Sequence, residues 1–186
     1  MKKTLLLLLT MLAVGNVISF AQNKVLVVVA NRNVSYEDPR WGNNNTITKG
    51  KAISVIDDGS NQYEWWLYPA ADVILAKKDF HVPGSIKGEK CIVINGTNVR
   101  FREKPSLQAG ILCYNIEHAG STYHIEFVKQ SSVQKNLRVD GVPVFWDPYY
   151  LPKGTRLPYK GRVGDFYKTE LNGMTLYISA KYCSLK

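Results

Sequence analysis

Cysteine and histidine are the residue types in this chain that could do covalent or metal chemistry. A nucleophilic cysteine needs a histidine to take its proton, and a third group usually orients that histidine. Cys91, Cys113 and Cys183 instead stand in apolar, strand-like stretches. The chain also has no G-x-S-x-G elbow, no H-E-x-x-H motif and no phosphate loop. We therefore predict no catalytic residue and no enzymatic activity, although an active site assembled from residues distant in the sequence stays an alternative.

Cys113, His118 and His124 are spaced loosely enough to suggest a zinc site. A structural zinc site needs four ligands, and no fourth ligand stands in a nearby motif. His124 also falls within an alternating run, Tyr123 to Phe127, which is typical of a strand with one face in solvent. We therefore predict ordinary strand histidines, no metal site and no cofactor.

Aromatic side chains are the better candidates for function, because they offer large rigid surfaces with a polar edge for peptide or sugar recognition. One group clusters around Trp65, and a second fills the run Phe145 to Tyr150. In a strand, Trp65 and Trp66 would point to opposite faces, so one should be core and the other exposed. Loop position favours exposure in the second group. The candidate ligand-binding residues are Trp41, Trp66, Trp146, Tyr149 and Tyr150. The alternative for each is a core position.

Short β-strands must position these residues, since no stretch combines helical periodicity with helix caps. The expected strands are 25–29, 52–56, 64–68, 91–94, 122–129, 166–171 and 175–179. Asn172-Gly173 joins the last two and is the strongest hairpin signal, because both residues accept positive φ. The spacing predicts an all-β fold of small barrels or sandwiches.

The first 21 residues read as a cleavable secretory signal. Lys2 and Lys3 precede an apolar run, and Ser19-Phe20-Ala21 supplies the small residues that a signal peptidase reads. The apolar run is shorter than the roughly 20 residues that a membrane span needs. We predict cleavage before Gln22, no membrane span in the mature chain, and a periplasmic or secreted product. An uncleaved anchor is the alternative.

The mature chain is basic. The signal contains only two charged residues, both lysines, so the net charge falls from +9 to +7 on cleavage. Such a balance favours anionic partners such as wall polymers, although scattered charges can also form an ordinary solvated surface. No run of Lys and Arg is interleaved with stacking aromatics, so we predict no nucleic-acid partner.

The mature chain contains an internal repeat. Residues 33–39 resemble 98–105, and Thr48-Lys49-Gly50 resembles Pro152-Lys153-Gly154. Residues 63–65 and 75–80 likewise parallel 166–168 and 178–182. From the glycine to the closing aromatic the two copies have similar lengths, 30 residues in the first (50 to 80) and 28 in the second (154 to 182). From the opening asparagine to that glycine they differ, with 17 residues in the first (33 to 50) and 56 in the second (98 to 154). The second copy therefore carries an insertion of 39 residues, placed at about 115–151.

The second copy resembles bacterial SH3-like domains of exported and wall-associated proteins. The motifs that carry the resemblance are Asn98-Val99-Arg100, Pro105, Lys153-Gly154-Thr155, Gly164 to Lys168, Asn172-Gly173 and Tyr177 to Tyr182. In such a barrel Val99 and Phe166 would fill the core, and Tyr182 would close one end. The chain departs from the family pattern in having Phe101 to Pro105 where R-x-G-P is usual, and in its insertion. The first copy is a weaker match, without an N-G turn.

The resemblance implies two SH3-like barrels in tandem, at 22–82 and 91–186, joined by a linker at 83–90. If 91–186 is one barrel, its first and last strands lie side by side, and Cys91–Cys183 is the most plausible disulfide; three unpaired cysteines are the alternative. The resemblance also implies a binding module, with peptidoglycan or its peptides as the best-known ligand. The alternative partner is another exported protein, contacted or inhibited through the insertion.

Overall fold

The computed structural model describes residues 24–39, 41–57, 59–67, 71–119, 122–133, 138–139, 142–143 and 146–186. The predicted signal and its cleavage site lie outside these residues. In the described part the fold is all-β, as predicted, with short 3₁₀ helices as its only helical elements. No helix there is both long and apolar enough to cross a membrane. All seven predicted strands are found, with ends that differ by a few residues at most.

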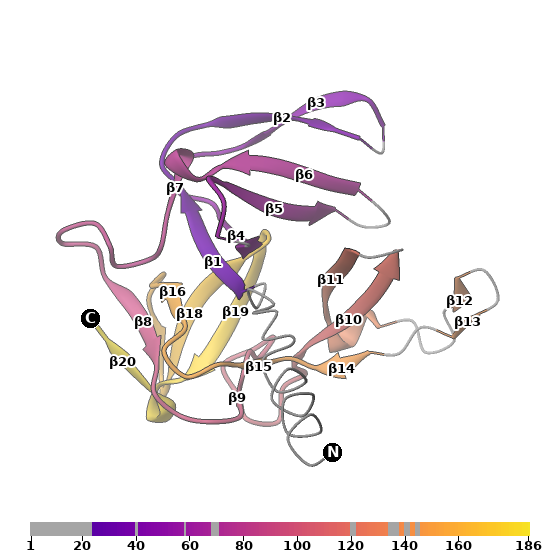
Figure 1. Ribbon diagram of the computed structural model, residues 1–186. Helices are drawn as coiled ribbons and strands as arrows, with labels where there is room; N and C mark the ends of the chain where they lie inside the picture. Colours follow the sequence, from indigo (N-terminus) through magenta and orange to yellow (C-terminus); the bar gives the residue numbers. More distant parts are fainter. Residues whose placement is uncertain are drawn as a thin grey trace, which may run out of the picture.

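The first half of the chain forms a curled, antiparallel five-stranded sheet (Figure 1). Its order is β6 (Ala71–Ala76), β5 (Gln62–Leu67), β4 (Ala52–Asp57), β1 (Lys24–Ala30) and β7 (Phe80–His81). A hairpin of β2 (Val34–Asp38) and β3 (Asn43–Ile47) covers it, and the 3₁₀ helix η1 (Lys77–Asp79) leads into β7. Apolar residues run without a break from Val25 to Ala30 in β1, and successive side chains of a strand point to opposite faces, so this strand has apolar side chains to bury on both faces of the sheet.

The second half repeats these elements around β8 (Cys91–Ile94), which lies between β16 (Arg156–Pro158) and β20 (Cys183–Leu185). β9 (Val99–Arg100) pairs with β15 (Tyr150–Leu151). β17 (Arg162–Val163), β18 (Phe166–Leu171) and β19 (Met174–Ser179) form a separate sheet, and η3 (Ala180–Tyr182) leads into β20. Apart from β17 and the segment between β9 and β15, the order of elements therefore matches that of the first half.

Several backbone hydrogen bonds repeat between the halves. The N–H of Gly50 donates to Ala30 at 2.8 Å, and that of Gly154 donates to Ile94 at 2.7 Å. Both glycines have positive φ, at 82° and 88°, which is why this turn requires glycine. The N–H of Asn31 donates to the carbonyl of Asp79 at 2.8 Å, and the N–H of Asn95 donates to that of Tyr182 at 2.9 Å. The repeat seen in the sequence is thus a repeat of backbone structure.

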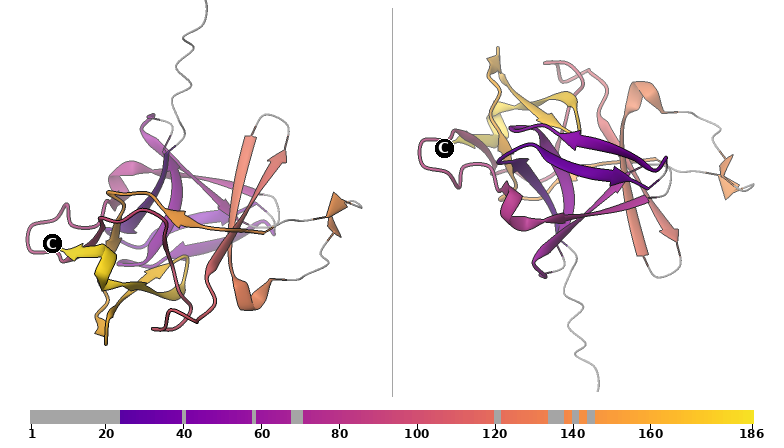
Figure 2. Two further views of the ribbon diagram at one scale, coloured as in Figure 1. Left: turned by 90° about the horizontal axis from the view of Figure 1, so that it is seen from below. Right: turned by 90° about the horizontal axis from the view of Figure 1, so that it is seen from above.

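A long excursion separates β9 from β15. It contains β10 (Leu112–Ala119), β11 (Thr122–Lys129), η2 (Gln130–Ser132), β12 (Arg138–Val139), β13 (Val142–Pro143) and β14 (Asp147–Pro148). β10 pairs with β11 and with β14. Figure 2 shows β12 and β13 at the side of the molecule farthest from the C-terminus. The excursion overlaps the predicted insertion, but its first strand begins at Leu112 and packs that residue in the core.

The hydrophobic core has two parts, and β1 contributes to both. Val28 and Ala30 pack in the core of the first half with residues such as Ile53 and Phe80. Val27 and Val29 point to the opposite face and join Ile92, Ile94 and other residues of the second half. Burying a valine side chain contributes about 1.5–3 kcal/mol. The larger core therefore crosses the boundary predicted from the sequence at residues 83–90.

The disulfide predicted between Cys91 and Cys183 is wrong, although β8 and β20 do lie side by side. Cys183 pairs with Ile94, whereas Cys91 exchanges two backbone hydrogen bonds with Lys186. The two cysteines are thus offset by three residues, or about 10 Å along the strands, whereas a disulfide needs Cα atoms within about 7 Å. Cys91, Cys113 and Cys183 are all free.

Candidate functional site

The predicted aromatic residues do not form one site. Trp41 lies in the turn between β2 and β3 and is 74% exposed. Figure 1 shows this hairpin at the opposite side of the molecule from β14 and β15, which flank Tyr149. Trp66 belongs to β5, where its backbone pairs with Asp72, and its side chain lies outside the described part. Its neighbour Trp65 packs against the first core and against the ring of Tyr36.

Trp146, Tyr149 and Tyr150 were predicted to be exposed, and of these three only Tyr150 is. Tyr150 is 40% exposed. The indole nitrogen of Trp146 is buried and has no hydrogen-bond partner among the described residues. Tyr149 packs in an aromatic cluster, with its ring 4.7 Å from that of Phe127 and 5.7 Å from that of Tyr114. Burial raises the pKa of Tyr149 to about 12. Tyr149 and Tyr150 differ because successive residues of an extended chain point to opposite sides.

A groove in the second half gathers polar and aromatic groups, and we call it the arginine groove. It has a volume of about 310 Å³. Its lining consists of Thr97, Asn98, Val99, Arg100, Arg102, Leu107, Phe166, Ser179 and Tyr182. Val99 and Phe166 were predicted to fill the core, and Tyr182 was predicted to close one end of it. Val99 and Phe166 are buried and line the groove where the core reaches the surface, whereas Tyr182 is 43% exposed.

The two arginines of this groove are held in place. The backbone of Arg102 exchanges hydrogen bonds of 2.7 and 2.8 Å with Tyr177, and its guanidinium donates to the carbonyl of Ala109 at 2.9 Å. The guanidinium of Arg100 donates to the hydroxyl of Tyr150 at 2.5 Å and lies 4.7 Å from the centre of that ring. No carboxylate of the described residues lines the groove or forms an ion pair with either arginine. The groove therefore favours an anionic ligand.

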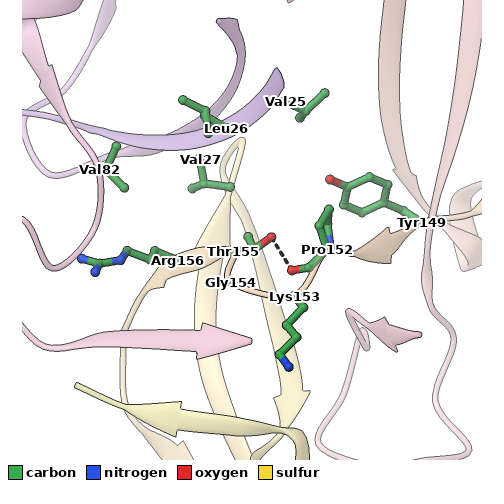
Figure 3. A pocket seen from close by; sticks show the side chains of 10 residues that line it. All are labelled: Val25, Leu26, Val27, Val82, Tyr149, Pro152, Lys153, Gly154, Thr155 and Arg156. Carbon is green, nitrogen blue, oxygen red and sulfur yellow. Dashed lines mark hydrogen bonds between the residues drawn. The ribbon is translucent and has the colours of Figure 1, made fainter. Parts of the chain in front are cut away.

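A larger cavity of about 820 Å³ lies beside β1, and we call it the β1 cavity (Figure 3). Val25, Leu26 and Val27 of β1 form one wall, and the turn from Pro152 to Arg156 forms the other. Val82 and Tyr149 complete the lining. Among the described residues, Lys153 and Arg156 are the only charged ones that line it, and the hydroxyl of Thr155 donates to the carbonyl of Pro152 at 2.7 Å. Tyr149, which was predicted to bind ligand, lines this cavity.

The free thiols are poor nucleophiles in this fold. Burial raises the pKa of Cys91, Cys113 and Cys183, and that of Cys183 reaches about 11. A raised pKa keeps a thiol protonated at neutral pH, whereas catalysis and metal binding need the thiolate. Within the part of the chain that is described, no three His, Cys, Asp or Glu side chains come together to hold a metal. The side chains of His118 and His124 lie outside that part.

The loop that connects the two halves is held by a carboxylate. Glu89 accepts a hydrogen bond from the N–H of Gly84 at 2.6 Å, and its other oxygen lies 2.9 Å from Nε2 of His81. The guanidinium of Arg156 lies 3.4 Å from the carbonyl of Gly84. These contacts attach residues 81–89 to both halves and so fix one side of the β1 cavity, at Val82.

Comparison with known proteins gives no relative: no family model, no curated protein and no solved structure matches this chain.

Proposed function

We propose that this chain is an exported, non-catalytic binding protein made of two SH3-like barrels, and that it recognises cell-wall peptidoglycan or its peptides. The observation that carries the proposal is the arginine groove. It combines two fixed guanidinium groups with aromatic and aliphatic walls, and no carboxylate of the described residues lines it. Peptides of wall polymers carry free carboxylates together with small apolar side chains, and both would be accommodated there.

Arg100 is the residue we assign to the ligand carboxylate. A guanidinium can bind a carboxylate through two parallel hydrogen bonds, and its planar fork is more selective than an ammonium group. The hydroxyl and ring of Tyr150 fix the guanidinium in advance, so less side-chain entropy is lost on binding. Tyr150, one of the aromatic residues chosen from the sequence, thus acts as a positioning residue for Arg100.

Two further observations support other parts of the proposal. The repeated hydrogen bonds around Gly50 and Gly154 support two copies of one barrel. The raised pKa of all three thiols supports a non-catalytic role, because it opposes nucleophilic attack at neutral pH.

Co-sedimentation with purified peptidoglycan sacculi tests the proposal. We expect the protein to pellet with sacculi at low and at high salt, and Arg100→Gln to reduce the pelleted fraction. Arg162→Gln is the matched control, because the guanidinium of Arg162 likewise lies over a tyrosine ring, 5.8 Å from the centre of that of Tyr167, but Arg162 lies outside the groove. Equal losses for the two variants, or pelleting at low salt only, would reduce the interaction to the basic surface. No pelleting at all would favour another exported protein as the partner.

A further inference from the structure

One edge of strand β1 is unpaired over most of its length among the described residues. The strand pairs with β4 along Lys24 to Val29, but on its other side β7 covers only Val29 and Ala30. Among the described residues, no strand pairs with residues 24–28 on that side. At about 3.4 Å per residue, this edge is roughly 17 Å long. An unpaired edge is a template for another strand, and proteins usually cover or blunt it.

The backbone groups that this edge presents can be assigned from the hydrogen bonds at its end. The N–H and the carbonyl of Ala30 both bond to the β4 side, through Lys51 and Gly50. Because these groups alternate along an antiparallel strand, those of residues 24, 26 and 28 also face β4. The N–H and carbonyl groups of Val25 and Val27 therefore face away from β4, toward the β1 cavity that these residues line.

The cavity beside this edge has room for a chain. Its volume of about 820 Å³ lies within the range of established ligand sites. Figure 3 shows β1 on one side of it and Pro152, Thr155 and Tyr149 on the other. An added strand would alternate its side chains between the two faces of β1, so that those on one face would contact Tyr149 and Pro152.

The positive charge of the cavity favours an acidic peptide over a basic one. Lys153 and Arg156 line the cavity, and none of the acidic residues that the structure describes does. Lys153 is exposed, so it is free to reach a ligand. An acidic side chain on an added strand would meet these two cations, whereas a basic one would be repelled.

We propose that the β1 cavity is a second binding site, which takes an extended acidic segment of another polypeptide as an added antiparallel or parallel strand on Val25 to Val27. Main-chain hydrogen bonds would supply affinity, and alternate apolar and acidic side chains would supply specificity. The site is separate from the arginine groove, with which it shares no lining residue.

Selection from a display library of random eight-residue peptides, followed by affinity measurement, tests this proposal on protein purified after expression of the full chain. We expect enriched peptides that alternate aliphatic and acidic residues. Val25→Pro should weaken their binding about tenfold, because it removes one edge hydrogen bond. It leaves the ladder to β4 intact, since the lost N–H faces the cavity. Val25→Thr keeps the N–H and the branched shape, so it is the matched control. Lys153→Glu should weaken the same peptides in a salt-dependent way.

Several results would overturn the proposal. They are a library with no enriched peptide, enriched peptides that bind Val25→Pro as well as Val25→Thr, and enrichment of basic sequences. Self-association of the protein that Val25→Pro abolishes would make a second copy the occupant instead. Arg100→Gln should leave peptide binding unchanged, so failure of the arginine groove and failure of this site are distinguishable. Thermal unfolding of each variant establishes that a loss of binding is not a loss of fold.

Discussion

The turn Asn172-Gly173 should stabilise the joint between the two halves as well as the hairpin it closes. The side-chain oxygen of Asn172 accepts a hydrogen bond from the N–H of Ser54 at 2.8 Å, and its amide donates to the Ser54 hydroxyl at 2.8 Å. Its backbone N–H donates to the carbonyl of Ala52 at 3.0 Å. These bonds satisfy backbone groups on the outer edge of β4, 118 residues away in the sequence.

The substitution Asn172→Gly measures what the side chain of Asn172 contributes to the free energy of unfolding. Glycine keeps the positive φ of 48° that Asn172 adopts, so the turn and its backbone hydrogen bond survive. Two side-chain hydrogen bonds are lost, each with a net contribution of about 0.5–1.5 kcal/mol. Because the site is only partly buried, water can replace part of that contribution, and we expect the free energy of unfolding to fall by about 1–2 kcal/mol. Asn172→Ala should cost more, since it adds about 1–2 kcal/mol of left-handed backbone strain.

Urea unfolding followed by tryptophan fluorescence measures the effect. Asn98→Gly is the matched control, because Asn98 also has positive φ, at 56°, yet is exposed and forms no side-chain hydrogen bond with the described residues. We expect that variant to stay within about 0.5 kcal/mol of wild type. A double-mutant cycle with Ser54→Ala should give a coupling of about 0.5 kcal/mol or more. Equal stabilities for Asn172→Gly and Asn98→Gly would refute the reasoning.

Two further predictions concern the phenol of Tyr149 and the turn at Gly84. Burial raises the pKa of Tyr149 from 10.0 to about 12, so the neutral phenol stabilises the fold below about pH 10, and that contribution is lost as the pH rises to about 12. Urea unfolding across this range should show a steeper loss for wild type than for Tyr149→Phe, and parallel curves would contradict the assignment. Gly84→Ala should destabilise by about 2–4 kcal/mol, because its Cβ would overlap the Cys91 sulfur and its φ is +76°. Gly88→Ala, with φ +84° and open space around it, should show only the backbone part of that cost in the same assay.

The sequence by itself determined seven of the strands and the internal repeat. Strand formation follows from local alternation and from turn residues, which is why β1, β4, β5, β8, β11, β18 and β19 were predicted close to their observed ends. The other strands, many of them only two or three residues long, were not predicted. The glycines of the two K-G turns marked the repeat, because positive φ restricts such positions to glycine wherever the turn occurs. The disulfide prediction was correct in placing β8 beside β20 but wrong in the register of the two strands, because Cys183 lies opposite Ile94 and not opposite Cys91. That register depends on contacts outside either strand.

The tertiary structure decided which surfaces are available for binding. Tyr149 and Tyr150 are neighbours of the same type, yet one packs in an aromatic cluster and the other holds Arg100 at the surface. The arginine groove joins residues from 97–107 with residues from 166–182, and the β1 cavity joins 25–27 with 152–156. No local sequence pattern predicts these contacts between distant segments. They depend on β1 packing one face in each core and on β7 pairing only with the end of β1. The types of the functional side chains can be read along the chain, but their grouping is a property of the fold.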